Sequence, residues 1–176
     1  MIFRKLYSIL ILLCFAFEAN AHTIDEIRLK FKLAIENAEV TETLSAQLLR
    51  IPNPDAITLA YIASLDALKA KHNWNPAVKI EFMDSFEKKI TKAVNALPNN
   101  IEIRFLRYSI QSNTPAFLGY SKNLKEDRKV MVSAFFNKAM LNNNKKLLSE
   151  IYQFLVEENS LTQSEKSKIE NALRNN

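Results

Sequence analysis

The sequence predicts an all-α fold of stacked antiparallel helical hairpins, with about seven helices. Apolar residues recur at spacings of three and four along most of the chain, as on the buried face of a helix. Asparagine or threonine precedes several of these runs, as helix N-caps do. The 176 residues include one glycine, whereas β-hairpin turns and phosphate-binding loops favour glycine at several positions.

The first 21 residues have the features of a secretory signal peptide. Arg4 and Lys5 form a basic start, and an apolar run over residues 6–17 follows. Residues 19–21 read Ala-Asn-Ala, which is a typical cleavage signal. We therefore expect an exported protein, periplasmic or secreted, with a cleaved signal peptide over residues 1–21.

The remaining chain, residues 22–176, is expected to form a single helical domain. The apolar run is short for a membrane span, so no integral span is expected after cleavage. An uncleaved anchor is the alternative, which Glu18 disfavours. Lipid attachment at Cys14 is a second alternative, although Leu13 is not the small residue that such a signal needs. Cleavage would leave no cysteine, and hence no disulfide or thiolate metal site.

Capping residues and prolines set the expected helix boundaries. Thr23 with Glu26 forms a capping box for the first helix. Asn-Pro pairs at residues 53–54 and 75–76 place a cap before a proline at the first helical position. Thr162 with Glu165 caps the last helix. The helices are expected over about 23–40, 41–50, 54–72, 76–97, 100–111, 121–141, 147–155 and from 162 onwards.

The helix after Pro98 is expected to be the buried centre of the fold. Its apolar residues also alternate as they would in a strand, but the cap at Asn99 and two helical apolar stripes favour a helix. Apolar residues cover most of its circumference, which is typical of a buried helix. Its narrow polar stripe consists of Arg104, Arg107 and Gln111.

A short turn through Phe117 and Leu118 follows and ends at Gly119. This glycine is expected to form a left-handed helix cap. Close backbone packing against Tyr120 or Trp74 is the alternative reason for a glycine at this position.

The junction over residues 93–100, which reads Ala-Val-Asn-Ala-Leu-Pro-Asn-Asn, resembles the end of a tetratricopeptide repeat. The helices on either side are longer than a 34-residue unit allows, so the likeness is to an α-α superhelix in general. Residues 67–71, 74–76, 100–107 and 117–120 together resemble small exported helical proteins of Bacteroidota that have no assigned activity. This resemblance implies export and a helical fold, and it supplies no catalytic residues.

Arg104 and Arg107 are the first candidate binding residues, together with Gln111. Two guanidinium groups on one helix suit an anion or a carboxylate. The alternative is that they form internal ion pairs with acidic residues of flanking helices, because buried arginines need partners whatever their role. Candidate partners are Asp84, Glu87 and Asp127.

Aromatic residues are the second candidate set. They could line a groove for a peptide or an apolar ligand, or they could belong to the core. The set consists of Trp74, Tyr108 and Tyr120, with Tyr61 and Phe117 as further members.

Other functional classes find little support. Two histidines, His22 and His72, are too few for the usual metal motifs, although an N-terminal histidine can chelate copper. The net charge of +5 is mild, and the lysines lack the aromatic interleaving of a nucleic-acid surface. No nucleophile motif or glycine-rich phosphate loop is present. We expect no cofactor, no metal, no nucleic acid and no catalysis.

The expected function is that of an exported binding or adaptor module for another envelope protein or peptide. The alternative is a carrier of a small ligand or lipid in an aromatic-lined cavity. A carboxylate-based enzyme is a third possibility, which requires acids converging in a cleft near Arg104.

Overall fold

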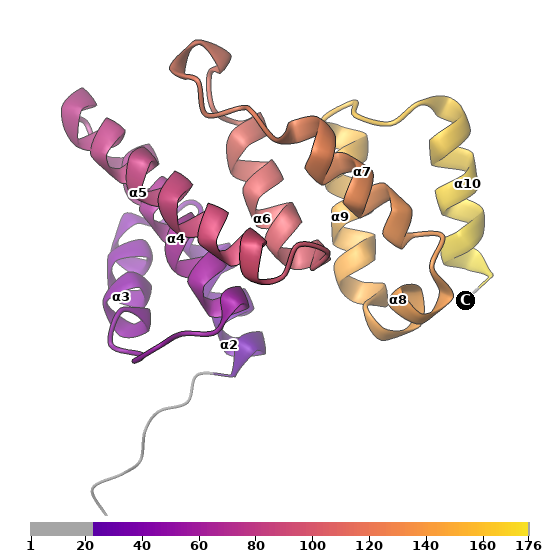
Figure 1. The fold of residues 1–176 in the computed structure, drawn as a ribbon, viewed down its shortest axis with the longest axis horizontal. Coiled ribbons are helices and arrows are strands. Elements are labelled where there is room, and N and C mark those ends of the chain that lie inside the picture. The colour runs from indigo at the N-terminus through magenta and orange to yellow at the C-terminus, as the bar shows by residue number, and fades with distance from the viewer. Residues whose placement is uncertain (1–22, 176) are drawn as a thin grey trace, which may run out of the picture.

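The computed structural model describes residues 23–175. These residues form nine α-helices, one short 3₁₀ helix and no strand (Figure 1). The all-α prediction is therefore confirmed. The elements are α2 (Ile24–Ala34), α3 (Ala38–Leu48), α4 (Ala56–His72), α5 (Pro76–Ala96), α6 (Ile101–Ser112), η1 (Ala116–Leu118), α7 (Leu124–Ala134), α8 (Lys138–Asn143), α9 (Lys145–Glu157) and α10 (Gln163–Arg174).

Two of the long helices expected from the sequence are broken, and the prediction was wrong there. The helix expected over 23–40 ends at Ala34, and the one expected over 121–141 ends at Ala134. Asn37 and Asn137 then cap the next helices, since their Oδ1 atoms accept from the N–H groups three residues on, at 3.1 and 3.0 Å. Neither break contains proline or glycine, and the apolar periodicity continues across both. The sequence pattern therefore predicted one continuous helix in each case.

Two other caps lie one or two residues from their expected places. Asp55, rather than Asn53, caps α4, and Asn53 instead takes a left-handed conformation with φ 51°. Asn100, rather than Asn99, caps α6 through the N–H groups of residues 102 and 103. The caps at Asn75 and Thr162 are confirmed.

Gly119 has φ 79°, as a left-handed cap requires. A Cβ atom there would meet nothing within 4 Å, so close packing against Tyr120 or Trp74 does not explain the glycine.

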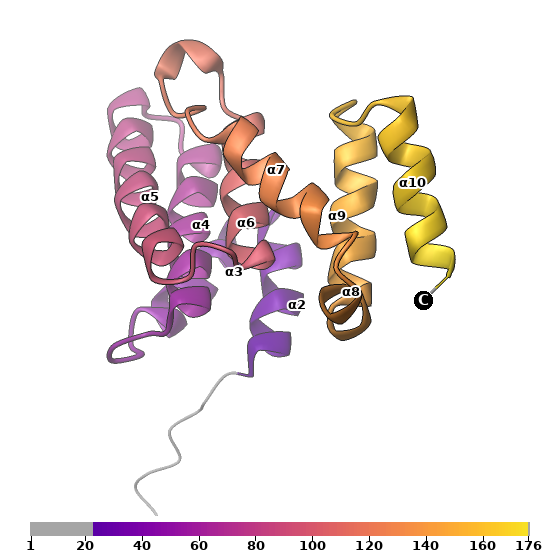
Figure 2. The ribbon, with the colours of Figure 1, turned by 45° about the vertical axis from the view of Figure 1, so that its right-hand side comes forward.

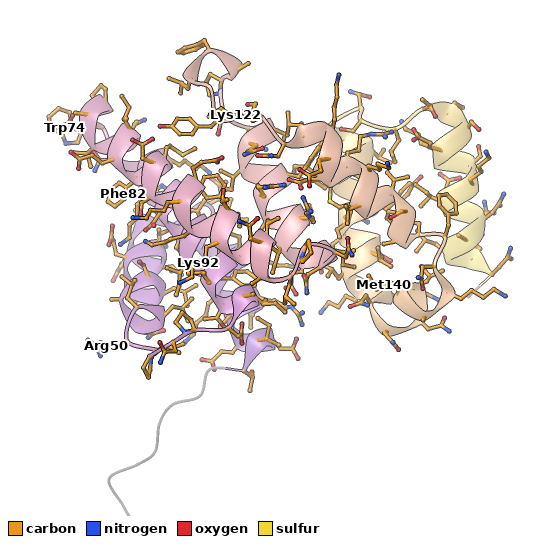
Figure 3. The ribbon with its side chains drawn as sticks, in the orientation of Figure 1. Arg50, Trp74, Phe82, Lys92, Lys122 and Met140 are labelled. Carbon is orange, nitrogen blue, oxygen red and sulfur yellow. The ribbon has the colours of Figure 1, made fainter. Side chains whose placement is uncertain are left out.

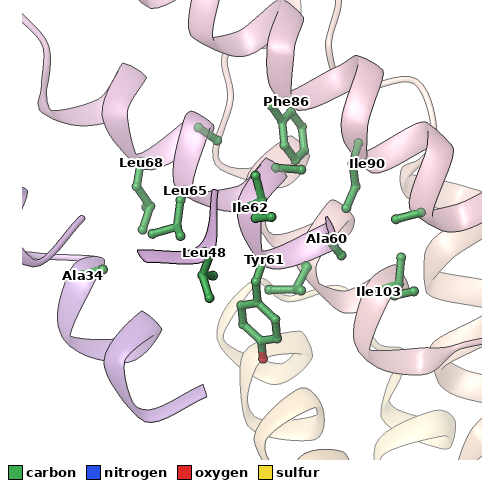
Figure 4. Packing of buried hydrophobic residues seen from close by; sticks show 14 of the residues in the cluster. Ala34, Leu48, Ala60, Tyr61, Ile62, Leu65, Leu68, Phe86, Ile90 and Ile103 are labelled. Carbon is green, nitrogen blue, oxygen red and sulfur yellow. The ribbon is translucent and has the colours of Figure 1, made fainter. Parts of the chain in front are cut away.

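A first core surrounds α4, which is buried along most of its length between α2, α3, α5 and α6 (Figure 4). Small residues cover part of α4, among them Ala60, Ala63 and Ala67. They let α5 lie along α4, where Phe86 and Ile90 are fully buried. Helices α2 to α6 thus form one packed bundle, the N-terminal bundle.

A second core surrounds α9 and draws on α7, α8 and α10. Helix α6 belongs to both cores, because Ile103 and Leu106 face the first while Ile101 and Tyr108 face the second. The prediction of a buried central helix is confirmed, and the strand alternative for this segment is wrong.

No helix within residues 23–175 is both long and apolar enough to cross a bilayer. The expected signal peptide, Cys14 and His22 lie outside the described residues.

Candidate functional site

The polar stripe of α6 is occupied by internal contacts with α7. Arg107 donates from Nε and Nη2 to the two carboxylate oxygens of Asp127, at 2.7 and 2.6 Å. Arg104 donates from Nη1 to Asp127 and Glu126, at 2.8 and 2.7 Å, and from Nε to the Pro98 carbonyl. Both arginine side chains are about 95% buried, and Asp127 is fully buried. The alternative of an internal ion pair with Asp127 is confirmed.

Gln111 continues this network along α6. Its amide nitrogen donates to Glu87 of α5 and to Asn123, each at 3.3 Å, and its oxygen accepts from the Asn123 N–H at 3.2 Å. Gln111 therefore fixes the start of α7. Glu87 and Asp84 do not partner the arginines, since Asp84 accepts from the Tyr120 hydroxyl at 2.7 Å.

The aromatic candidates do not come together in one groove. Tyr108 is buried in the second core and its hydroxyl meets Ser160 at 2.8 Å. Tyr61 belongs to the first core, and Tyr120 lies against α5. Trp74 and Phe117 are 89% and 86% exposed, and neither lines the cleft described next.

A concavity lies elsewhere, between α2, α6 and α9. It is a cleft of about 850 Å³. Figure 2 shows α9 standing beside α2 and α6, and the cleft lies where these three helices meet. We call it the α2/α6/α9 cleft. Its walls come from the N-terminal bundle on one side and from the second core on the other.

The polar floor of the cleft is built on Glu102. Arg28 donates to both carboxylate oxygens, from Nε and Nη2, at 2.7 Å each, which is the strong bidentate geometry. The Tyr61 hydroxyl donates to the Oε1 atom at 2.7 Å. Burial, reinforced by the negative charge of Glu102, raises the pKa of Tyr61, so the phenol remains a donor at neutral pH.

The walls of the cleft are mainly apolar. Helix α2 contributes Leu29, which is 64% exposed, and Phe31, which meets the Tyr61 ring edge-on at 5.2 Å. Helices α6 and α9 contribute Phe105 and Phe154, whose rings also meet edge-on at 5.3 Å. Such edge-to-face pairs hold the rings in fixed orientations.

One ion pair crosses the mouth of the cleft. Lys32 Nζ of α2 lies 2.6 Å from Glu150 Oε1 of α9. The two side chains are 55% and 34% exposed, and exposed pairs contribute about 0–1 kcal/mol. This contact is therefore weak enough to open for a bound segment.

Of the residues that line the cleft, only Tyr61 was among the sequence-based candidates. Glu102 lies three residues after Asn99, where it could complete a capping box, and it is the one acid within α6. Arg28 lies four residues after Ile24 and three before Phe31, so it interrupts the apolar stripe of its helix. Charged residues inside apolar faces were the available signal in both cases.

The described residues offer no group of three or more His, Cys, Asp and Glu side chains able to hold a metal ion. Comparisons with known protein families, with curated proteins and with solved structures give no match for this chain.

Proposed function

We propose that the protein is an exported helical binding module that holds a segment of another envelope protein in the α2/α6/α9 cleft. The observation that carries the proposal is an open cleft with apolar walls and a fixed polar floor. The signal-peptide features of residues 1–21 support export.

The chemistry of the cleft suits an amphipathic segment. Leu29, Phe105 and Phe154 offer apolar surface to one face of a partner helix or extended peptide. Charged groups at the rim, Lys32 and Glu150 among them, offer contacts to its polar face. Grooves of this kind recognise peptides by a few apolar anchors, with the rim setting orientation.

A relation to tetratricopeptide-like stacks is part of the same proposal. The hairpin of α4 and α5 and the Pro98 junction into α6 support it, because those stacks are built from consecutive helical repeats, although α4 and α5 are longer than the tetratricopeptide unit allows.

A carrier of a small amphipathic ligand or lipid is the second candidate. Its support is the cleft volume of about 850 Å³, which falls within the usual range for small-molecule sites. The carboxylate-enzyme alternative draws less support, because Glu102, Glu126 and Asp127 all accept hydrogen bonds from arginines.

Site-specific photo-crosslinking tests the binding module. A photoreactive residue is placed at Leu29 in the cleft, and a matched one at Leu49, which is 57% exposed at the end of α3 and outside the cleft. In cells that export the protein into their envelope, we expect the photoreactive residue at position 29 to give a discrete crosslinked protein adduct. The residue at position 49 should give none. Leu29→Asp should remove partner recovery in pull-downs, whereas Leu49→Asp should not.

Two results would contradict this proposal. Equal labelling from both positions would mean that the cleft is no specific site. A small molecule or lipid that co-purifies with the protein and is lost in Leu29→Asp would favour the carrier instead, and native mass spectrometry would detect it.

A further inference from the structure

Two loop tips expose aromatic side chains almost completely. Trp74, the only tryptophan in the chain, is 89% exposed in the loop between α4 and α5. Phe117 is 86% exposed in η1. Tryptophan and phenylalanine are usually well buried, so two such side chains left in water are unusual in a domain with two closed cores.

Each tip is apolar beyond its aromatic residue. Beside Trp74, the first turns of α5 expose Pro76 and Ala77, and Ile80 is 51% exposed. Around Phe117, the residues from 115 to 119 are all exposed, and Leu118 is 43% exposed. Both tips lie toward the upper left of Figures 1 and 2, with η1 above the α4–α5 loop, and Figure 3 labels Trp74 at the left end of the molecule.

The η1 tip is held in place, partly by the hairpin that carries the other tip. The Tyr120 hydroxyl donates to Asp84 of α5 at 2.7 Å, just after the tip. Before the tip, Thr114 Oγ1 donates to the Ile110 carbonyl at 2.7 Å. Ser121 Oγ donates to the Gln111 carbonyl at 2.9 Å and so closes the stem of the loop. Phe117 is thus presented from a fixed stem.

We propose that these tips form a docking edge for an anionic phospholipid bilayer, with Trp74 and Phe117 entering the headgroup region. Aromatic rings favour this region of a membrane, where a largely apolar side chain meets water. Lys122 is exposed close to the η1 tip, and the chain carries a net charge of +5. Basic residues near an anionic surface each add about 1 kcal/mol of attraction.

The shape of the edge favours lipid over a protein partner. The aromatics stand on two separate convex tips, and neither lines the α2/α6/α9 cleft. Protein hot spots are instead usually well packed and surrounded by further contacts. The docking edge is independent of the cleft and of its occupant.

Trp74 itself reports on docking. The chain without residues 1–21 is used, because the apolar leader would bind lipid by itself and both described cores lie within residues 23–175. Vesicles containing phosphatidylglycerol should shift the Trp74 emission to shorter wavelength, and brominated lipids should quench it. Pure phosphatidylcholine vesicles should bind roughly tenfold or more weakly, since basic residues lose their attraction there.

Matched variants test whether vesicle binding depends on the docking edge. Phe117→Ala should weaken vesicle binding roughly five- to tenfold, as expected for losing one largely inserted aromatic ring. Lys122→Gln should weaken binding to anionic vesicles about fivefold. Phe136→Ala, at a site 54% exposed in the turn between α7 and α8, should bind like the parent. Circular dichroism confirms that each variant is folded.

An unchanged Trp74 emission with anionic vesicles would overturn the proposal, as would equal weakening by Phe117→Ala and Phe136→Ala. Equal binding to neutral vesicles would overturn the requirement for anionic lipid. Loss of a protein partner in Phe117→Ala without vesicle binding by the parent would assign the edge to protein contact instead.

Discussion

At Asp127, one fully buried carboxylate receives hydrogen bonds from two buried guanidinium groups. Burying charges costs several kcal/mol each, and mutual attraction offsets this only when the geometry is good and all partners are present. The neighbouring Glu126 contacts the same arginines, but its side chain is 56% exposed. Water therefore screens the contribution of Glu126 to stability. Hydrogen bonding by Arg104 lowers the pKa of Glu126.

Asp127→Asn should lower the free energy of unfolding by about 3–5 kcal/mol, because two buried cations lose their compensating charge. Glu126→Gln is the matched variant on the same arginines and should cost less than about 1 kcal/mol. Urea denaturation measures both. Similar losses in the two variants would contradict the role given to burial.

The sequence predicted that Arg104 and Arg107, if buried, need acidic partners, and Asp127 was one of three candidates. Composition and spacing could not choose between them, because the choice depends on how α7 crosses α6. For Glu102, in contrast, the partner was not among the residues that the sequence suggested. Its partner Arg28 lies 74 residues away, and only the packed bundle brings the two together.

At the scale of single helices, the capping side chains determine where each helix begins, and they decided which boundaries could be predicted. The caps at Asn75, which precedes a proline, and at Thr162, which is completed by Glu165, were predicted correctly, whereas the Asn53-Pro54 pair did not mark the cap of α4. Asn37 and Asn137 were missed, since an asparagine within an apolar periodic run gives a break only when its side chain accepts from the following turn.

The capping box of α10 makes the stability of that helix depend on pH. Hydrogen bonds from Arg128 and from the Thr162 backbone lower the pKa of Glu165 to about 2, from an ordinary value of 4.5. A depressed folded-state pKa contributes stability above the unfolded-state value, which is lost as pH falls through the folded-state value. Helix α10 should therefore lose stability between about pH 4.5 and pH 2.

Hydrogen exchange of the α10 amides across this pH range measures the loss. In Glu165→Gln, α10 should already exchange faster at neutral pH, and its remaining pH dependence should be smaller. An unchanged pH profile in this variant would assign the acid sensitivity to another carboxylate.

At the scale of the whole molecule, α6 joins the two cores. Ile103 is fully buried in the first, and Tyr108 lies in the second. The cleft depends on the same joint, because α2 and α9 both face α6 there. An interior helix could be predicted from its apolar circumference, but the cleft could not. It arises from contacts between segments as distant as Lys32 and Glu150, which no periodicity encodes.

Ile103→Ala should lower the free energy of unfolding by about 2–5 kcal/mol through lost burial and a cavity. Because α6 serves both cores, the exchange protection of α4 and of α9 should fall together. Ile80→Ala, at an exposed position of α5, is the control and should change little. Loss of protection in α4 alone would mean that the two cores unfold separately.

The first core has a consequence for the order in which the chain folds. All its buried members lie between Ile27 and Leu106. A chain that emerges N-terminus first, from a ribosome or a translocation pore, can close this bundle before its last third has appeared. Helix α9 then packs against the already folded bundle of α2 to α6 and completes the far wall of the cleft. The site that we propose for a partner thus forms only after the first core has closed.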